Sequence, residues 1–326
     1  MPEEVASLEE ALRLERPEKA VGEIVEGIRR EVEAFRRRGA VVGLSGGVDS
    51  SVVASLAVRA LGPERVLGVM MPEAESSSEG LELGRLVAAR LGIETVLEDI
   101  TPVLEAAGCY RHRDEAIARV IPEYGPGWKA KLVLPSLLAS SQYRLSSVFV
   151  RGPAGEEKSA RLPPSEYLQV VAATSFKQRV RKMMEYFHAD RKHYVVLGTP
   201  NRLEYDQGFF VKNGDGSADV KPIAHLYKSQ VYQLASVLDV PEAVVNAGPT
   251  TDTYALPQTQ SEFFFSVPYQ TLDVCLYAVD HGVPAAEVAR QLGLEHEQVE
   301  RVFADIASKR RVAEYLHAAP RLLGAG

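Results

Sequence analysis

The segment from Ser45 to Ser51, which reads Ser-Gly-Gly-Val-Asp-Ser-Ser, constrains the fold of this chain more than any other feature. It follows a short apolar run and leads into a longer one at residues 52–61, an order that predicts a strand, a tight turn and a helix. The glycines let the backbone approach a ligand closely, and amides at a helix N-terminus attract anions. The segment therefore predicts a phosphate-binding loop. The residues of this predicted loop are Leu44, Ser45, Gly46, Gly47, Asp49, Ser50 and Ser51.

The loop differs from the Walker phosphate loop, because it has no Gly-Lys-Ser/Thr ending and no lysine. It carries Asp49 instead, and a carboxylate beside phosphates implies a divalent cation between them. In these features it resembles the pyrophosphate loop of ATP pyrophosphatases, enzymes that cleave ATP between its α and β phosphates. An ordinary turn between strand and helix is the alternative, but it does not account for the glycines, hydroxyls and aspartate together.

Composition and charge narrow the functional classes. The chain has 326 residues, of which 46% are apolar and 25% are charged, as in ordinary globular proteins. A net charge of −7 argues against a nucleic-acid-binding surface. Cys109 and Cys275 fit neither a zinc site nor a disulfide framework, so we expect a cytoplasmic protein. No apolar stretch reaches membrane length, and the acidic N-terminus is unlike a signal peptide.

Apolar periodicity predicts strands that alternate with helices along the first hundred residues and again in the second half. Such alternation is typical of an α/β fold with an open parallel sheet, helices on both faces and ligands at the carboxyl ends of the strands. We also expect a helical segment at the C-terminus. The expected strands are 41–45, 65–71, 94–99 and 193–198, and the expected helices are 16–38, 48–61, 79–91, 171–188, 228–238 and 284–316.

Residues 108–169 interrupt this alternation. The stretch is rich in proline and glycine, and a β-like piece at 146–151 precedes a turn-rich run. Because a long excursion inside a compact domain is usually functional, we interpret it as an inserted subdomain that could contain a hairpin. The predicted organisation is an N-terminal helical segment at 1–40, a nucleotide-binding core at 41–107 and 170–245, the insertion at 108–169, and a substrate-covering helical segment at 246–326.

Short segments in the second half carry a family resemblance. They are residues 197–204 (LGTPNRLE), 208–216 (GFFVKNGDG), 218–219 (AD) and 226–230 (LYKSQ). Their order and spacing after the phosphate loop resemble NAD+ synthetase, of the adenine nucleotide α-hydrolase-like superfamily. The resemblance covers roughly residues 20–105 and 170–315 and leaves the insertion outside it, as a part that the usual ammonia-dependent enzymes lack.

The resemblance implies a carbon–nitrogen ligase. Enzymes of this family use ATP to adenylate the carboxylate of nicotinic acid adenine dinucleotide and then amidate it with ammonia, releasing AMP and pyrophosphate. Because adenylation brings two anions together, it requires cations and fixed dipoles. The resemblance therefore implies Mg²⁺ as a cofactor, ATP as a co-substrate and, since the family forms homodimers, a homodimer.

The same resemblance assigns roles to individual residues. Asp49 and Glu204 would hold the magnesium ion, and Lys228 would contact the β and γ phosphates, so these three are the predicted catalytic residues. Lys228 precedes a helix that we expect to be exposed, which favours a role in phosphate binding over a role in folding. The other matched positions are Arg179, Thr199 and Thr250 beside ATP, and Lys212, Asp215, Asp219 and Lys309 beside the dinucleotide.

Two departures from the family pattern leave the acceptor open. Residues 211–215 read Val-Lys-Asn-Gly-Asp in place of Thr-Lys-Tyr-Gly-Asp, and an acidic stretch has become aromatic at Phe263 to Phe265. The same chemistry on a different carboxylate is therefore an alternative, and a non-catalytic nucleotide-binding module is a second one. Because the insertion coincides with these departures, we expect it to cover the acceptor side of the site and exclude water.

The sequence also bears on the nitrogen source. No amidase domain fits into the roughly forty residues before the loop, so free ammonia or a separate glutaminase would supply nitrogen.

Two other protein classes are disfavoured. A tRNA-modifying enzyme would add catalytic cysteines or a basic RNA-binding domain, and this sequence shows neither. Residues 285–302 mimic a helix-turn-helix, but Glu295, Glu297 and Glu300 would repel phosphates, so we interpret them as a helical hairpin.

Overall fold

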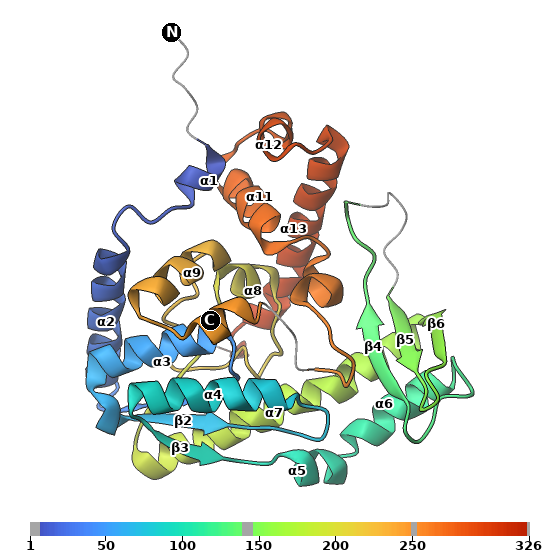
Figure 1. The fold of residues 1–326 in the computed structure, drawn as a ribbon, viewed down its shortest axis with the longest axis horizontal. Coiled ribbons are helices and arrows are strands. Elements are labelled where there is room, and N and C mark those ends of the chain that lie inside the picture. Colours follow the sequence, from blue (N-terminus) through green and yellow to red (C-terminus); the bar gives the residue numbers. More distant parts are fainter. Residues whose placement is uncertain (1–6, 139–145, 249–252, 325–326) are drawn as a thin grey trace.

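A four-stranded parallel sheet forms the centre of the fold (Figure 1). The computed structural model describes residues 7–138, 146–248 and 253–324. The strand order is β3-β2-β1-β7, so the strands predicted from the sequence are all present and pair as one sheet. The strands are β1 (Ala40–Gly43), β2 (Val66–Met70), β3 (Glu94–Leu97) and β7 (Val195–Leu197).

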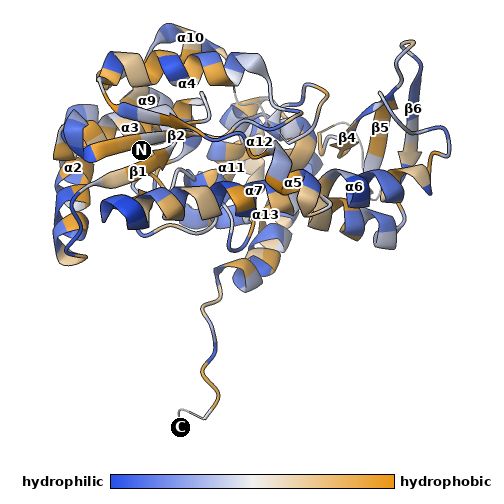
Figure 2. Ribbon diagram, turned by 90° about the horizontal axis from the view of Figure 1, so that it is seen from below, coloured by the Kyte–Doolittle hydropathy of each residue, from blue (hydrophilic) through white to orange (hydrophobic). Residues whose placement is uncertain are grey.

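Helices cover both faces of this sheet, which confirms the predicted α/β class. Successive side chains of a strand point to opposite faces. Val42 and Leu197 therefore pack against helices on one face, whereas Val41 and Val196 pack on the other face against Ala189 of α7. Figure 2 shows the apolar strands β1 and β2 in orange, with α4 and α7 on opposite sides. The helices are α2 (Pro17–Ala34), α3 (Val48–Leu61), α4 (Ser78–Leu91) and α9 (Lys228–Val237) on the first face, and α7 (Pro164–Lys192) on the second.

Residues 108–169 contain a second, smaller sheet (Figure 1). Its strands are antiparallel and pair in the order β4-β5-β6, and the β-like piece expected at 146–151 forms the central strand. Val148 and Val150 pack against Ile117 and Val170, so one face of the sheet is buried by α6 and α7. The elements are α6 (Cys109–Ala118), β4 (Lys129–Val133), β5 (Ser147–Arg151) and β6 (Glu157–Arg161), and the short helix α5 (Thr101–Ala106) precedes them.

Helix α7 links the two sheets. It begins at Pro164 rather than at residue 171 and is 29 residues long. Proline suits the first turn of a helix, because its missing N–H would have no partner there. The helix therefore crosses the expected end of the insertion at residue 169, and its first turns belong to the apolar core of the small sheet.

The C-terminal part is helical, as predicted, and it packs against the end of the main sheet that carries α8 and α9 (Figure 1). The expected hairpin at 285–302 is formed by α12 and the start of α13. Among the described residues, no helix is long and apolar enough to span a membrane. The elements are α11 (Tyr269–His281), α12 (Ala285–Leu292) and α13 (His296–His317).

Several short elements were not predicted. Helices of four to six residues bury few side chains and therefore leave little apolar periodicity in the sequence. The π-turn places the three phenylalanines Phe263 to Phe265 in one turn of chain, a geometry that no helical or strand period describes. The unpredicted short helices and turns are α1 (Leu8–Ala11), α5, α8 (Arg202–Gln207), α10 (Glu242–Asn246), a 3₁₀ turn at Pro63–Arg65 and the π-turn at Ser261–Phe265.

Candidate functional site

A cavity of about 1520 Å³ opens at the carboxyl ends of β1 and β7. The chain runs from β1 to β2 and β3 on one side of the sheet, whereas β7 lies on the other side of β1. The loops after β1 and β7 therefore diverge, which is where open α/β sheets bind ligands. The predicted site residues that line the cavity are Leu44, Ser45, Gly47, Asp49, Ser50, Arg179, Thr199, Glu204, Lys212, Asp215, Lys228 and Lys309.

The phosphate loop is held in shape by its own hydroxyl groups. Gly47 is the N-cap of α3, and its carbonyl accepts hydrogen bonds from the hydroxyls of Ser50 (3.0 Å) and Ser51 (2.8 Å). Gly46 has a φ of 84°, and a side chain there would come within 2.2 Å of the carbonyl oxygen of Gly80. A glycine is therefore required at this position, and the helix N-terminus stays open to an anion.

Asp49, Glu204 and Lys228 meet beside this loop. The Nζ atom of Lys228 forms an ion pair with Oδ2 of Asp49, while the side-chain amide of Asn201 donates to Oδ1 at 3.1 Å. The backbone N–H of Asn201 donates to Oε2 of Glu204 at 3.1 Å. Asn201 was not predicted, although an N-cap asparagine followed three residues later by glutamate is a capping box, a pattern that the sequence does contain.

The electrostatics of this centre fit a shared cation. Burial and then the charge of Asp49 raise the pKa of Glu204 to about 7. Burial opposes ionisation of Lys228, but the charges of Asp49 and Glu204 outweigh it and raise the pKa of the lysine. Two carboxylates thus face one ammonium, and an additional cation would relieve their repulsion. Mg²⁺ typically takes one or two carboxylates and completes its shell with waters and phosphates, so Asp49 and Glu204 fit it.

The described residues offer few metal ligands beyond Asp49 and Glu204 at this site. In the described part of the chain, no group of three or more His, Cys, Asp or Glu side chains could hold a metal ion. A site of two carboxylates therefore suits an ion that arrives with the phosphates of a nucleotide rather than a resident structural metal.

Lys228 is not on an exposed helix, so that expectation was wrong. Its side chain is 2% exposed, because the first turn of α9 packs against α11. Asp273 of α11 accepts hydrogen bonds from the backbone N–H groups of Lys228 (3.2 Å) and Ser229 (2.7 Å). A carboxylate at a helix N-terminus is favourable and here holds the lysine in place. Asp273 was not predicted, since 45 residues separate it from Lys228.

The two lysines predicted to bind the dinucleotide line the cavity but also hold other parts of the chain. Lys212 donates to the carbonyl oxygen of Tyr315 at 2.6 Å, near the C-terminus of α13. Lys309 donates to the carbonyl oxygen of Phe264 at 2.9 Å. Both ammonium groups therefore stabilise the C-terminal part of the chain in addition to facing the cavity.

The two predicted aspartates differ in position. Asp215 lines the cavity, accepts a hydrogen bond from the N–H of Val211 at 2.7 Å, and has a pKa raised to about 6 by burial. Asp219 does not line the cavity, contrary to its predicted place. Its carboxylate accepts from the N–H of Val196 at 2.7 Å and from the hydroxyl of Tyr186 at 3.3 Å. Asp219 thus extends the edge of the main sheet beyond β7.

The remaining predicted residues also have distinct positions. Arg179 lies on the exposed face of α7 at the cavity rim, and its Nε atom donates to the carbonyl oxygen of Lys212 at 3.3 Å. Thr199 follows β7 and lines the cavity. The hydroxyl of Ser51 bonds to the carbonyl oxygen of Gly47 at the start of its own helix, and Ser51 does not line the cavity. Thr250 lies outside the described residues.

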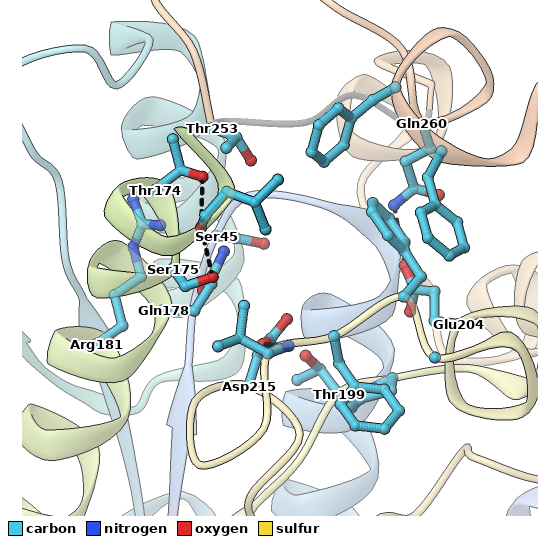
Figure 3. A pocket seen from close by; sticks show the side chains of 18 of the residues that line it. Ser45, Thr174, Ser175, Gln178, Arg181, Thr199, Glu204, Asp215, Thr253 and Gln260 are labelled. Atoms are coloured by element: carbon cyan, nitrogen blue, oxygen red, sulfur yellow. Dashed lines mark hydrogen bonds between the residues drawn. The ribbon is translucent and has the colours of Figure 1, made fainter. Parts of the chain in front are cut away.

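One end of the cavity has an apolar wall that the sequence did not reveal. Figure 3 shows Thr174, Ser175 and Gln178 of α7 on one side and Glu204 with Gln260 on the other. The apolar side chains come from the small sheet, from the start of α7 and from the aromatic π-turn. The wall consists of Leu132, Leu134, Leu162, Tyr167, Val171 and Phe263. The cavity thus offers a phosphate-binding end and an end suited to a flat organic group.

Comparison with known proteins agrees with this geometry. The sequence model of the family described as NAD synthase matches residues 20–120 and 156–313. The chain is 56% identical over 300 residues to the NH(3)-dependent NAD(+) synthetase of Rhizobium meliloti (strain 1021), covering 92% of this chain and 90% of that protein. It is 36% identical over 259 residues to the NH(3)-dependent NAD(+) synthetase of Thermotoga maritima, covering 79% and 85%.

Two solved structures share the fold. The NMN synthetase from Francisella tularensis superposes with a TM-score of 0.65 at 22% identity, covering 94% of this chain and 98% of that one. The NH3-dependent NAD synthetase from Campylobacter jejuni superposes with a TM-score of 0.62 at 22% identity, covering 94% and 99%.

The family match also bears on the insertion. Between its two matched parts it leaves out residues 121–155, which hold β4 and β5, and it includes the rest of 108–169. The bounds of the insertion and its absence from the usual ammonia-dependent enzymes stay predictions. The chain belongs to the NAD synthase family.

Proposed function

We propose that this chain is an ammonia-dependent NAD+ synthetase, a carbon–nitrogen ligase. It adenylates the carboxylate of nicotinic acid adenine dinucleotide with ATP and amidates it with ammonia, giving NAD+, AMP and pyrophosphate. The observation that carries this function is the meeting of Asp49, Glu204 and Lys228 beside an open phosphate loop. The 56% identity to a protein of that name supports the acceptor and the nitrogen donor.

The first step joins the acceptor to AMP. An oxygen of the acceptor carboxylate attacks the α phosphorus of ATP, and the bond to the β phosphate breaks as pyrophosphate leaves. The amides of the loop and the ammonium of Lys228 would stabilise charge on the phosphates. A magnesium ion held by Asp49 and Glu204 would neutralise the phosphate oxygens and orient them.

The second step forms the amide. The nitrogen of ammonia attacks the acyl carbon, loses a proton, and AMP leaves with the bonding electron pair. Water would compete with ammonia for the same carbon. The apolar wall formed by Leu132, Leu134 and Phe263 supports a site from which water is excluded at this stage.

A different acceptor carboxylate is the alternative within the same chemistry. The altered residues Val211, Asn213, Phe263 and Phe264 line the cavity, in the part of the site where the acceptor would bind. The mononucleotide of nicotinic acid is the sharpest competitor, since a protein named NMN synthetase has the same fold. A non-catalytic nucleotide-binding role is the weaker alternative, because all three predicted catalytic side chains are present and adjacent.

The test combines ATP, Mg²⁺, ammonium and either the dinucleotide or the mononucleotide of nicotinic acid with purified protein. We expect AMP, pyrophosphate and NAD+ from the dinucleotide. Asp49→Asn should keep its shape but lose a metal ligand, lowering turnover by at least about a hundredfold with little change in melting temperature. Release of ADP and phosphate, or amide formation from the mononucleotide alone, would contradict the proposal.

Assembly, location and nitrogen supply complete the proposal. A homodimer is supported by the family resemblance and by Met183 and Phe187, which are 51% and 57% exposed one turn apart on α7. A cytoplasmic location is supported by the buried free thiols of Cys109 and Cys275. Free ammonia or a separate glutaminase would supply the nitrogen. In either case, glutamine alone should not replace ammonium in an assay with the purified protein.

A further inference from the structure

One hydrogen bond connects Glu204 to a distant part of the chain. The side-chain amide of Gln260 donates to Oε1 of Glu204 at 2.9 Å (Figure 3). The other carboxylate oxygen accepts from the backbone N–H of Asn201 at 3.1 Å. Each oxygen of Glu204 is therefore held by one donor, and each keeps a lone pair for a further ligand.

We propose that Gln260 is a positioning residue for Glu204, and that the small sheet holds Gln260 in place through Lys131 and Glu262. The inference rests on the proposed function, in which Glu204 is a ligand of the magnesium that accompanies ATP. A donor on a carboxylate oxygen fixes the orientation of the carboxylate. A fixed carboxylate would bind a cation more strongly.

Strand β4 anchors the stretch at residues 257–266, which we call the aromatic segment, on both sides of Gln260. The Nζ atom of Lys131 lies 2.6 Å from Oε1 of Glu262 and 3.3 Å from the carbonyl oxygen of Pro257. The side-chain amide of Gln258 donates to the carbonyl oxygen of Leu132. The Lys131 and Glu262 side chains are 17% and 34% exposed, so their ion pair is partly shielded from water.

The opposite side of the aromatic segment packs on the helix that carries Glu204. Phe209, just after α8, stacks on Phe264 with ring centroids 4.7 Å apart. Lys309 of α13 donates to the carbonyl oxygen of Phe264 at 2.9 Å. The aromatic segment is thus held between α8, α13 and β4, and Gln260 reaches Glu204 from that fixed frame.

The position of β4 gives this connection a consequence. Leu132 and Leu134 line the apolar end of the cavity, and the backbone of the same residues bonds to the aromatic segment. The same strand therefore forms the wall for the acceptor and supports the partner of Glu204. Because β4 lies in the part outside the family match, this support is an addition to the family's common core.

The first test measures binding of ATP in Mg²⁺ by calorimetry, without an acceptor, in the full-length protein. Gln260→Leu keeps a similar size but removes the donor, and should weaken binding roughly tenfold, as expected for a hydrogen bond to a charged group. Gln260→Glu would place a second carboxylate against Glu204 and should weaken the binding of ATP in Mg²⁺ further. Binding of ATP in EDTA and the melting temperature should stay near the wild-type values.

The second test separates the anchor from general damage to the sheet. Lys131→Met should weaken binding of ATP in Mg²⁺ in the same direction as Gln260→Leu, and the charge reversal Lys131→Glu with Glu262→Lys should restore most of it. The matched control is Lys129→Met, because Lys129 lies on the same face of β4 and is exposed. It should leave binding unchanged.

The outcomes distinguish the two proposals. If the wild-type protein binds ATP no better in Mg²⁺ than in EDTA, the proposed function and this inference both fail. If the wild type shows the Mg²⁺ effect and Gln260→Leu shows it equally, only the positioning role is overturned. Equal losses in Lys129→Met and Lys131→Met would overturn the anchoring role of the small sheet.

Discussion

At the scale of single residues, Asp273 illustrates how the site is built by groups that never touch a substrate. Its side chain is fully buried and accepts hydrogen bonds from the first two N–H groups of α9. Burial raises its pKa to about 6, although those amides partly counteract the shift. The side chain of Asp273 therefore fixes the end of α9 that presents Lys228. Because burial disfavours its charged form, loss of its proton destabilises the folded state.

This conflict predicts how the free energy of unfolding depends on pH. In the folded state Asp273 keeps its proton up to about pH 6, whereas its ordinary value is 3.8. Between pH 3.8 and about pH 6 the unfolded chain binds fewer protons than the folded protein. The free energy of unfolding therefore falls as the pH rises through this range, by about 3 kcal/mol for Asp273 alone. Asp273→Asn should reduce that fall, measured by urea unfolding at pH 4.5 and 7.5.

Other groups add to the same slope and provide a check. Burial also raises the pKa of Asp215 to about 6, so part of the slope should survive in the Asp273→Asn variant. Asp99 is exposed and has a lowered pKa, so Asp99→Asn should leave the fall in stability intact. An unchanged slope in Asp273→Asn would show that Asp273 ionises in the folded protein as it does in water.

At the scale of elements, buried charges join α7 to the loop after β2. Lys177 is 1% exposed, and its Nζ atom lies 2.8 Å from Oε1 of Glu73 and 2.7 Å from Oε2 of Glu75. The same Nζ donates to the carbonyl oxygen of Thr253 at 2.7 Å. Buried charges persist only where they are paired, so this network ties the loop after β2 to α7 and to the chain leading into the aromatic segment.

The small sheet is expected to act as a cover over the acceptor end. Replacing residues 129–161 by a short Gly/Ser linker should leave ATP binding in EDTA intact and raise AMP release without amide formation by about tenfold, because water would reach the acyl-adenylate. The measurement is the ratio of AMP to NAD+ produced at limiting ammonium.

A milder pair of variants guards against misfolding of the shortened chain. Leu134→Ala opens the apolar wall, whereas Val133→Ala changes the neighbouring residue, which does not line the cavity. We expect the ratio of AMP to NAD+ to rise only in the former. Normal coupling in both the shortened chain and Leu134→Ala would show that the sheet is not a cover.

At the scale of the whole molecule, the strand order determines where the site lies. Helix α7, which covers the other face of the sheet, exposes apolar side chains on its outer surface. The divergence of the chain on either side of β1 creates the crevice into which α8, α9 and α13 bring side chains. The other face of the sheet is covered by α7, whose outer surface exposes Met183 and Phe187. A second copy of the chain would remove such side chains from water.

The homodimer is therefore testable at this surface. Replacing both Met183 and Phe187 by glutamate would place unpaired charges in an apolar contact and should weaken dimerisation by at least about a hundredfold. Light scattering should then give the mass of a single chain. The control is Leu86→Glu on α4, where Leu86 is 45% exposed. A wild-type monomer, or an unchanged dimer in the double variant, would contradict this interface.

The nucleotide half of this protein was determined by its sequence alone. A short apolar run, two glycines and a helical pattern specify β1, the phosphate loop and α3 through local rules, and Gly46 cannot be replaced without a clash. Asp49, Glu204 and Lys228 were predicted from the resemblance of short segments to NAD+ synthetase, and folding brings these three side chains together.

The support of the site was decided only by tertiary structure. Glu204 meets Gln260 across 56 residues, and Asp273 meets the start of α9 across 45, so no local pattern records either contact. The apolar wall has the same origin, since its leucines lie in or directly after β4 and β6, which read as polar or irregular sequence until the small sheet packs on α7. Local preferences define a strand, a loop or a helix, but the packing of distant elements decides which polar groups are buried together.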